Sequence, residues 1–206
     1  MSIAIQNERK RKVITQSEEN DDQILPLLPL KNMVLLPKSI LPVIVGRESS
    51  IRAVEHALKL SKTIFVAAQV HPDIESPTVE DIFPYGTRST ILQVMRMPNG
   101  SLKILVEGIQ RARLLMAHEG PEFTTVLYED IPLPNKIRSA DLEATWRFFQ
   151  ELYTEYAKFS EKVPQDLITV GSDKTLEDME YIVDTAAVHI NLTFEQRQEL
   201  LETVDL

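Results

Sequence analysis

Hydrophobic and polar residues alternate most regularly in the middle of the chain, between Leu102 and Val106. Every second residue of this run is apolar and Lys103 lies between two of them, as in a strand of a half-buried antiparallel sheet. Asn99-Gly100 separates this run from another β-rich run, and the pair favours a type I′ turn because both central residues need positive φ. The pattern therefore predicts a β-hairpin with its turn at Asn99-Gly100.

Further short strands and one helix are predicted on either side of the hairpin. Thr63–Val70 is typical of a buried strand, and Gly120-Pro121 turns the chain into a last strand, Phe123–Ile131. Gly108 permits a bend or bulge in the second arm of the hairpin. Apolar residues recur at helical spacing after Gly46, at Ile51, Val54 and Leu58. Several short strands with a single helix predict a small curled sheet or pseudo-barrel.

Prolines interrupt the apolar segment Gln23–Glu48 at Pro26, Pro29, Pro37 and Pro42. Proline has no backbone N–H donor and fixes φ, so central strands and helix interiors are disfavoured for this segment. It therefore predicts short, proline-bounded edge strands.

The composition changes from strand-like to helical after Pro132, which predicts an α+β fold with a separate helical part. Ser139 is suited to cap a long helix whose apolar residues recur at steps of three and four: Leu142, Trp146, Phe149, Tyr153 and Tyr156. These aromatic residues could line a ligand pocket, but core packing explains the spacing with no further assumption. Shorter helices are predicted at Pro164–Val170, from Thr175, and from Thr193 to the end of the chain.

Composition and motifs exclude several kinds of chemistry. The 31 acidic and 22 basic residues give a net charge of -9, which repels phosphate backbones unless basic residues gather on one face. There is no cysteine, and the four histidines show no metal-ligand spacing. No phosphate-binding G-x-x-x-x-G-K-[ST] and no G-x-S-x-G nucleophile motif occurs. We therefore expect a binding module without catalytic residues, metal or cofactor.

The N-terminal residues 1–23 predict a disordered tail. They carry a basic run, Arg9–Lys12, followed by a cluster of carboxylates, and they lack the apolar core of a secretory signal. No uncharged stretch approaches the length of a membrane span. These features favour a cytoplasmic protein that contacts no membrane.

Four stretches carry a resemblance to a known family: LPLLPLKNMVLLPKSILPVIVGRESSIRAVEHAL, PTVEDIFPYGT, ILQVMRMPNGSLKILVEGIQRARL and LTFEQRQELLETVDL. They resemble the N-terminal domain of bacterial Lon proteases, which are ATP-dependent AAA+ enzymes. The resemblance implies a PUA-like β pseudo-barrel with one helix at residues 24–131 and a helical subdomain at residues 132–206. It also implies that the domain recognises unfolded or degron-bearing proteins and supports self-association within a hexamer. The ATPase module that binds ATP and Mg, and the protease module with its Ser-Lys dyad, match nothing here, so we expect a non-catalytic fragment.

Two groups of residues are candidates for contact with a polypeptide substrate. Arg47 and Glu48 lie where a strand meets a helix, so we expect both to be exposed and able to bind polar groups, although Glu48 could simply complement the helix dipole. Met95, Met97 and Pro98 approach the hairpin turn, where flexible thioethers suit a promiscuous apolar surface. The alternative is that the face shared by the two methionines belongs to the core.

Two further functions stay open. An RNA-binding PUA-like module would need a basic face, to which Arg88, Arg96, Lys103, Arg111 and Arg113 could contribute. A free-standing adaptor with the same fold is the other. A nucleotide-binding motif encoded downstream in the parent gene would identify the protease instead.

Overall fold

The computed structural model describes residues 23–132, 139–160, 164, 167 and 175–204. Its β part contains β1 (Ile24–Leu30), β2 (Ile40–Val45), α2 (Glu48–Lys59), β3 (Thr63–Ala68), the 3-10 turn η1 (Val79–Asp81), β4 (Tyr85–Arg96), β5 (Leu102–Glu119) and β6 (Thr124–Asp130). Its helical part contains α3 (Ala140–Phe159), α4 (Leu176–His189) and α5 (Phe194–Glu202). Apart from Gln23, the predicted tail lies outside the described residues. Most of the helix predicted at Pro164–Val170 also lies outside them.

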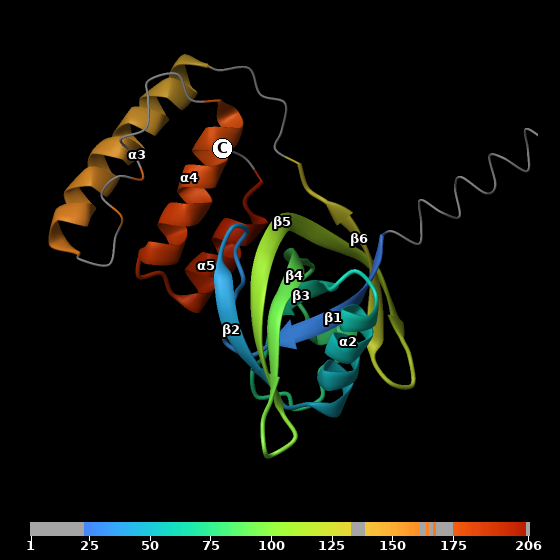
Figure 1. Ribbon diagram of the computed structural model, residues 1–206. Helices are drawn as coiled ribbons and strands as arrows, with labels where there is room; N and C mark the ends of the chain where they lie inside the picture. The colour runs from blue at the N-terminus through green and yellow to red at the C-terminus, as the bar shows by residue number, and fades with distance from the viewer. Residues whose placement is uncertain (1–22, 133–138, 161–163, 165–166, 168–174, 205–206) are drawn as a thin grey trace, which may run out of the picture.

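The strands form one mixed sheet that closes into a ring (Figure 1). The sheet order is β2-β5-β4-β3-β1-β6. The strand β5 also pairs with β6, and this additional pairing closes the ring. The first half of β5 pairs with β2 and the second half with β6, while β4 runs along its other edge. The predicted pseudo-barrel with one helix is therefore confirmed.

The edge-strand prediction is right for β2 and wrong for β1. Within the described sheet β2, which contains Pro42, pairs with β5 alone. β1 lies between two strands: Ile24–Pro26 pairs antiparallel with β6 and Leu27–Leu30 pairs parallel with β3. The first half of β1 is therefore paired with β6, and the second half is paired with β3. This arrangement accommodates two prolines, which cannot donate a backbone hydrogen bond, inside the ring.

The β-hairpin is confirmed, but its turn is not of type I′. Of the two residues predicted at the centre of the turn, Asn99 and Gly100, only Gly100 has a positive φ, at 85°. The Gly100 N–H donates to the Met97 carbonyl at 3.0 Å, and the Met97 N–H donates to the Ser101 carbonyl at 2.8 Å. These bonds define a three-residue loop with glycine in the left-handed position. Pro98 explains the difference: it has no N–H to close a two-residue turn at Asn99-Gly100, and its fixed negative φ suits the first central position of a type I turn.

Gly108 is required by a close approach of the backbone. A Cβ at this position would lie 2.3 Å from the Leu36 carbonyl oxygen, and the Gly108 N–H donates to the Ser39 carbonyl at 2.9 Å. The register slips between Arg88 and Ser89, where β5 carries one extra residue. The predicted bulge is therefore present, and it lies where the segment before β2 crosses the sheet.

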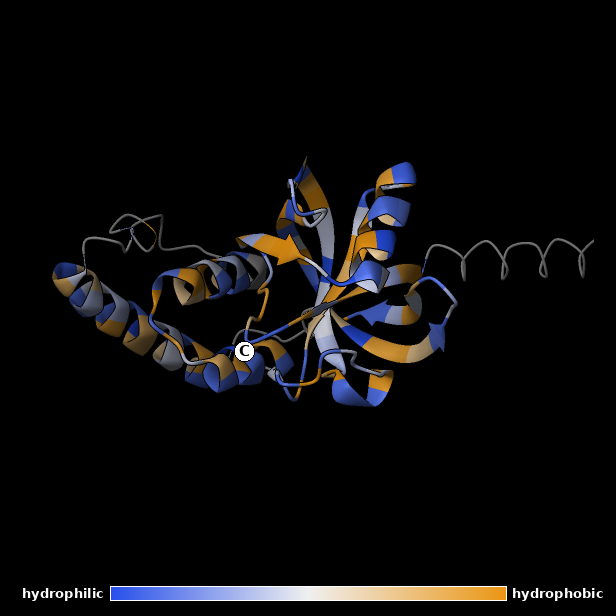
Figure 2. Cartoon of the chain, turned by 90° about the horizontal axis from the view of Figure 1, so that it is seen from below, coloured by the Kyte–Doolittle hydropathy of each residue, from blue (hydrophilic) through white to orange (hydrophobic). Residues whose placement is uncertain are grey.

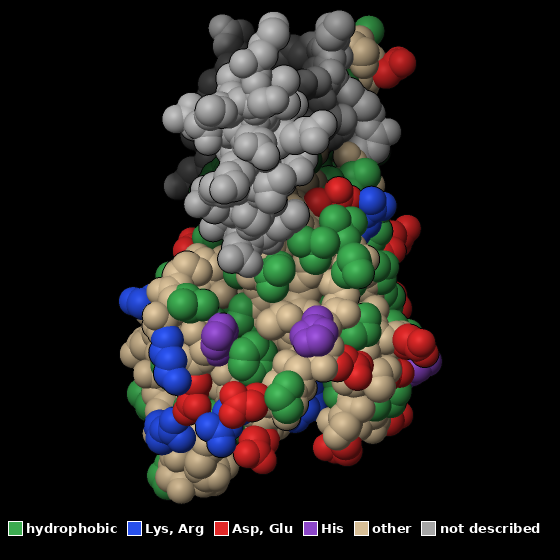
Figure 3. Space-filling view, turned by 90° about the vertical axis from the view of Figure 1, so that its right-hand side faces the viewer, with side chains coloured by type: hydrophobic (Ala, Val, Ile, Leu, Met, Phe, Trp, Pro, Cys, Tyr) green, Lys and Arg blue, Asp and Glu red, His purple; other side chains and the backbone are tan. Residues whose placement is uncertain are grey.

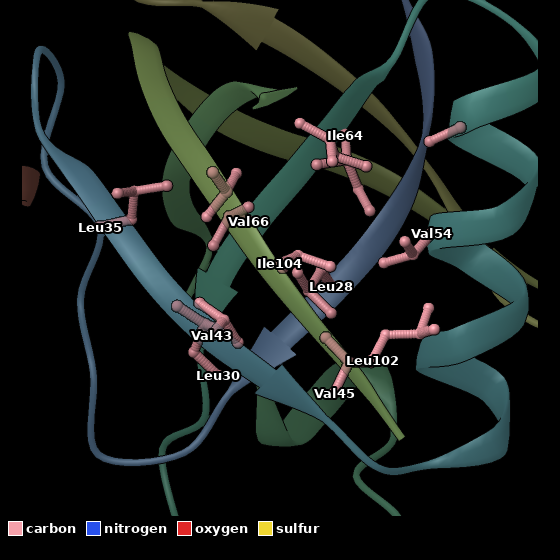
Figure 4. Packing of buried hydrophobic residues seen from close by; sticks show 13 residues of the cluster. Leu28, Leu30, Leu35, Val43, Val45, Val54, Ile64, Val66, Leu102 and Ile104 are labelled. Carbon is pink, nitrogen blue, oxygen red and sulfur yellow. The ribbon is translucent and has the colours of Figure 1, made fainter. Parts of the chain in front are cut away.

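The largest core fills the interior of the ring beneath α2 (Figure 4). The inward residues of β5 are at most 2% exposed, as their alternation predicts: Leu102, Ile104 and Val106. Val54 and Ala57 of α2 pack on the same cluster. Figure 2 shows that β2 is itself mostly hydrophobic. Because β2 has an inner and an outer face, part of this apolar surface points away from the core.

The helical part packs on itself and on the ring. Trp146 and Tyr153 of α3 are buried against α4, but Tyr156, which was predicted on the same face, is 38% exposed. The predicted caps are present: Ser139, Thr175 and Thr193 each accept a bond from the first turn of a helix. The last helix ends at Glu202 rather than continuing to the end of the chain. Ala187 of α4 and Leu201 of α5 share a core cluster with Val34, Leu36 and Ala68 of the β part.

Candidate functional site

The outer face of β2, β5 and β4 carries a row of exposed apolar side chains. Ile44 pairs with Lys103, which pairs with Met95, so these three side chains lie in one row on the outer face. Ile44 is 68% exposed and Met95 is 56% exposed. We define the outer strip as the apolar members of this face: Ile40, Pro42, Ile44, Leu105 and Met95. Apolar side chains that remain accessible on a sheet are suited to contact apolar segments of another polypeptide.

The structure separates the members of the predicted methionine group. Met95 lies in the outer strip, which contradicts the alternative that its face belongs to the core. Met97 is half-buried at the base of the hairpin turn, and Pro98 is exposed in that turn. Pro98 and Met95 therefore present accessible apolar surface at the same end of the hairpin.

Arg47 was predicted to be exposed, and the structure contradicts this prediction. Its side chain is half-buried, and it donates one hydrogen bond to the Gln69 Oε1 atom and a second to the Pro29 carbonyl at 3.5 Å. Desolvation by the surrounding atoms lowers the pKa of Arg47, and the negative charge of Glu75 partly opposes this effect. A position between strand and helix was correctly inferred, but the local sequence does not determine whether a long side chain turns outward or inward.

Gln69 connects Arg47 to the loop that follows β3. Its side chain is fully buried, and its Nε2 atom donates to the carbonyls of His71 at 3.3 Å and Ile74 at 3.0 Å. One buried amide therefore fixes both the guanidinium of Arg47 and the start of the loop that carries Glu75. The sequence analysis did not single out Gln69 or Glu75, because the prolines of this loop predict only irregular backbone.

A pocket of about 370 Å³ opens beside Arg47. The first turn of α2 forms one wall with Glu48, Ser49 and Ser50. The remaining walls come from β1, the loop before η1, the first residue of η1 and the start of β6: Leu27, Pro29, Glu75, Ser76, Pro77, Thr78, Val79 and Thr124. Glu48 is exposed as predicted, and its Oε1 atom lies 3.7 Å from a guanidinium nitrogen of Arg52. Hydroxyl groups are the commonest polar groups lining this pocket.

The five basic residues proposed for an RNA-binding face do not form one. Arg88 pairs with Asp130 at 2.9 Å, Arg113 with Glu129 at 2.6 Å and Arg96 with Glu55 at 2.5 Å. Figure 3 shows basic and acidic side chains interleaved on one face of the molecule. Since neighbouring carboxylates neutralise these guanidinium groups, this surface is unsuited to a phosphate backbone.

Arg111, the fourth arginine of that set, is buried between the β part and the helices. Its Nε atom donates to the Leu201 carbonyl at 2.9 Å, and its terminal nitrogens lie 3.3 Å from Glu180 and 3.2 Å from Asp184. Burial raises the pKa of Asp184 to about 6, although the positive charge of Arg111 opposes the rise. Arg111 therefore joins β5 to α4 and to the last turn of α5.

The residues missed by the sequence analysis lie mainly on β2. Ile40, Pro42 and Ile44 alternate with the inward Leu41, Val43 and Val45, so the run ILPVIV is apolar on both faces. An edge strand with two apolar faces was the available signal for an exposed apolar surface. Within the described residues no helix is both long and apolar enough to cross a membrane.

Comparison with known proteins agrees with this fold. Residues 24–206 match the family model of the ATP-dependent protease La (LON) substrate-binding domain. The chain is 34% identical over 182 residues to the Lon protease of Escherichia coli strain K12, and 35% identical over 182 residues to that of Syntrophomonas wolfei. The first match covers 88% of this chain and 23% of the Escherichia coli protein, so the chain spans about a quarter of that relative's length.

Two solved structures share the fold. The N-terminal domain of the Mycobacterium avium complex Lon protease superimposes with a TM-score of 0.67 at 22% identity, over 88% of this chain and 91% of that one. The Lon N-terminal domain protein from Xanthomonas campestris gives a TM-score of 0.59 at 16% identity, with the same coverage. On the evidence of the family match over residues 24–206, this chain belongs to the ATP-dependent protease La (LON) substrate-binding domain family.

Proposed function

We propose that this chain is the substrate-recognition part of a cytoplasmic, ATP-dependent Lon-type serine protease, and that it binds unfolded or degron-bearing proteins. The observation that carries the proposal is the outer strip, where Ile44 and Met95 expose 68% and 56% of their surface in one row. Unfolded polypeptides expose apolar side chains that folded proteins bury, so a shallow apolar strip distinguishes the two states. Met95 adds a flexible thioether, which adapts to side chains of different shape.

The proposal assigns no catalysis to this chain. Its full sequence lacks a phosphate-binding loop motif, and ATP, Mg and the Ser-Lys dyad are assigned to other parts of the parent protease. We further propose that residues 24–131 and 132–206 act as a β unit and a helical unit, and that the domain supports hexamer assembly. Binding by one domain is expected to be weak, because several linked copies in a hexamer raise the effective concentration of binding sites.

The test compares two double variants with matched exposure. Ile44→Ser with Met95→Ser removes two exposed apolar side chains of the outer strip. The control, Leu60→Ser with Met116→Ser, removes side chains that are 68% and 66% exposed elsewhere. Binding of a fluorescently labelled, permanently unfolded protein is followed by anisotropy, and thermal melting verifies the fold of each variant.

We expect the outer-strip variant to bind several-fold more weakly and the control to bind like the wild type. Equal affinity for both variants would remove the outer strip from the proposal. A free-standing adaptor remains the second function, and the parent gene distinguishes it, because an adaptor gene encodes no ATPase module downstream.

A further inference from the structure

The pocket beside α2 contains a guanidinium group without a carboxylate partner. Among the residues that the structure describes, no carboxylate oxygen lies within 4.0 Å of the Arg47 guanidinium nitrogens. Its two bonds go to neutral acceptors, the Gln69 Oε1 atom and the Pro29 carbonyl. A guanidinium has five N–H donors, so several remain available to a further acceptor. A half-buried charge of this kind is stabilised by an anion that binds beside it.

The two carboxylates of the pocket are each compensated by another cation. Glu75 accepts a hydrogen bond from the Lys31 ammonium group at 3.0 Å, and this bond lowers the pKa of Glu75. Glu48 lies 3.7 Å from Arg52. The charge of Glu75 also acts on Arg47 from beyond ion-pair distance, so the groups that directly contact the Arg47 guanidinium are the two neutral acceptors. The hydroxyl groups of Ser49 and Ser76 add neutral donors to the same pocket.

We propose that this pocket binds a carboxylate group of a bound polypeptide, with Arg47 as its charged partner. This inference rests on the proposed function, because it assumes that the ligand is a polypeptide. Arg47 follows Ile44 by three residues, so their Cα atoms are at most about 11 Å apart. An extended chain of a few residues is longer than this separation.

The carboxylate can come from the end of a chain or from an acidic side chain, and three peptides separate these sources. All carry the same fluorescent label and the same apolar core. The first has a glutamine and a free C-terminal carboxylate, the second is its C-terminal amide, and the third is an amide in which glutamate replaces the glutamine. Affinities are measured with the complete 206-residue chain.

We expect each peptide that carries a carboxylate to bind about tenfold more tightly than the neutral peptide, the range of a charge-assisted hydrogen bond in a partly solvated site. The preference should fall as salt concentration rises. It should be lost in Arg47→Met, which keeps much of the aliphatic stem. It should be retained in Arg113→Met, which removes an arginine that is not part of the pocket. If only one carboxylate peptide binds more tightly, the source is identified and the proposal stands.

Equal affinity of the wild-type chain for all three peptides would overturn the carboxylate site, and this result needs no substitution near Gln69. If Ile44→Ser with Met95→Ser still weakened peptide binding, the proposed function would stand without the pocket. If none bound and the unfolded protein also failed to bind, the proposed function itself would be wrong.

Discussion

Replacing Arg111 with alanine should greatly destabilise the chain, because this residue joins its two parts from a buried position. Arg111 is 7% exposed and Asp184 is 2% exposed. The substitution removes the cation at 3.2 Å from Asp184 and at 3.3 Å from Glu180, together with the donor to the Leu201 carbonyl. Removing one partner of a buried ion pair typically costs about 3–5 kcal/mol. Uptake of a proton by Asp184 would remove its unpaired charge and so reduce this loss of stability.

Urea unfolding of the full chain at neutral pH measures this loss. Arg113→Ala is the matched control, because Arg113 lies two residues away and its ion pair with Glu129 is exposed to solvent, where such a pair contributes about 0–1 kcal/mol. Arg111→Met combined with Asp184→Leu should recover much of the stability, since the buried Asp184 charge is removed together with its partner and only the partly exposed Glu180 loses its cation. A loss below about 0.5 kcal/mol for Arg111→Ala would refute the reasoning.

Two further predictions concern pH and the Arg47 network. The pKa of Asp184 is about 6 in the folded chain against an ordinary value of 3.8, so the folded state holds the proton more tightly and Asp184 makes stability fall as pH rises from about 4 to 7. The fall amounts to about 3 kcal/mol at 1.36 kcal/mol per pKa unit, and urea titrations should show it reduced in Asp184→Asn; an unchanged pH profile would contradict the assignment. Arg47→Ala should cost about 1–3 kcal/mol, because the buried Gln69 Oε1 atom loses its donor. Glu48→Ala should change stability by less than about 0.5 kcal/mol, and equal melting temperatures for the two variants would show that the Gln69 bond contributes little.

The amino-acid sequence by itself determined the elements whose signals are local. Alternation from Leu102 to Val106 predicts which residues of β5 face the core, and Ser139, Thr175 and Thr193 predict where three helices begin. Each of these features depends on neighbours within a few residues, through side-chain direction in a strand or a hydrogen bond in the first helical turn. The resemblance of four sequence stretches to Lon proteases correctly identified the family.

The tertiary structure alone decided which of these residues meet across the fold. β1 lies inside the ring rather than at an edge, because β6, which pairs with Ile24–Pro26, comes about 100 residues later in the chain. Arg111 pairs with Asp184 across 73 residues, and Arg47 reaches Gln69 across 22, although both arginines resemble ordinary surface residues in sequence. A long cationic side chain can turn toward water or toward a buried acceptor with the same local backbone. Only the surrounding strands and helices, brought together by the burial of apolar surface, determine which direction it takes.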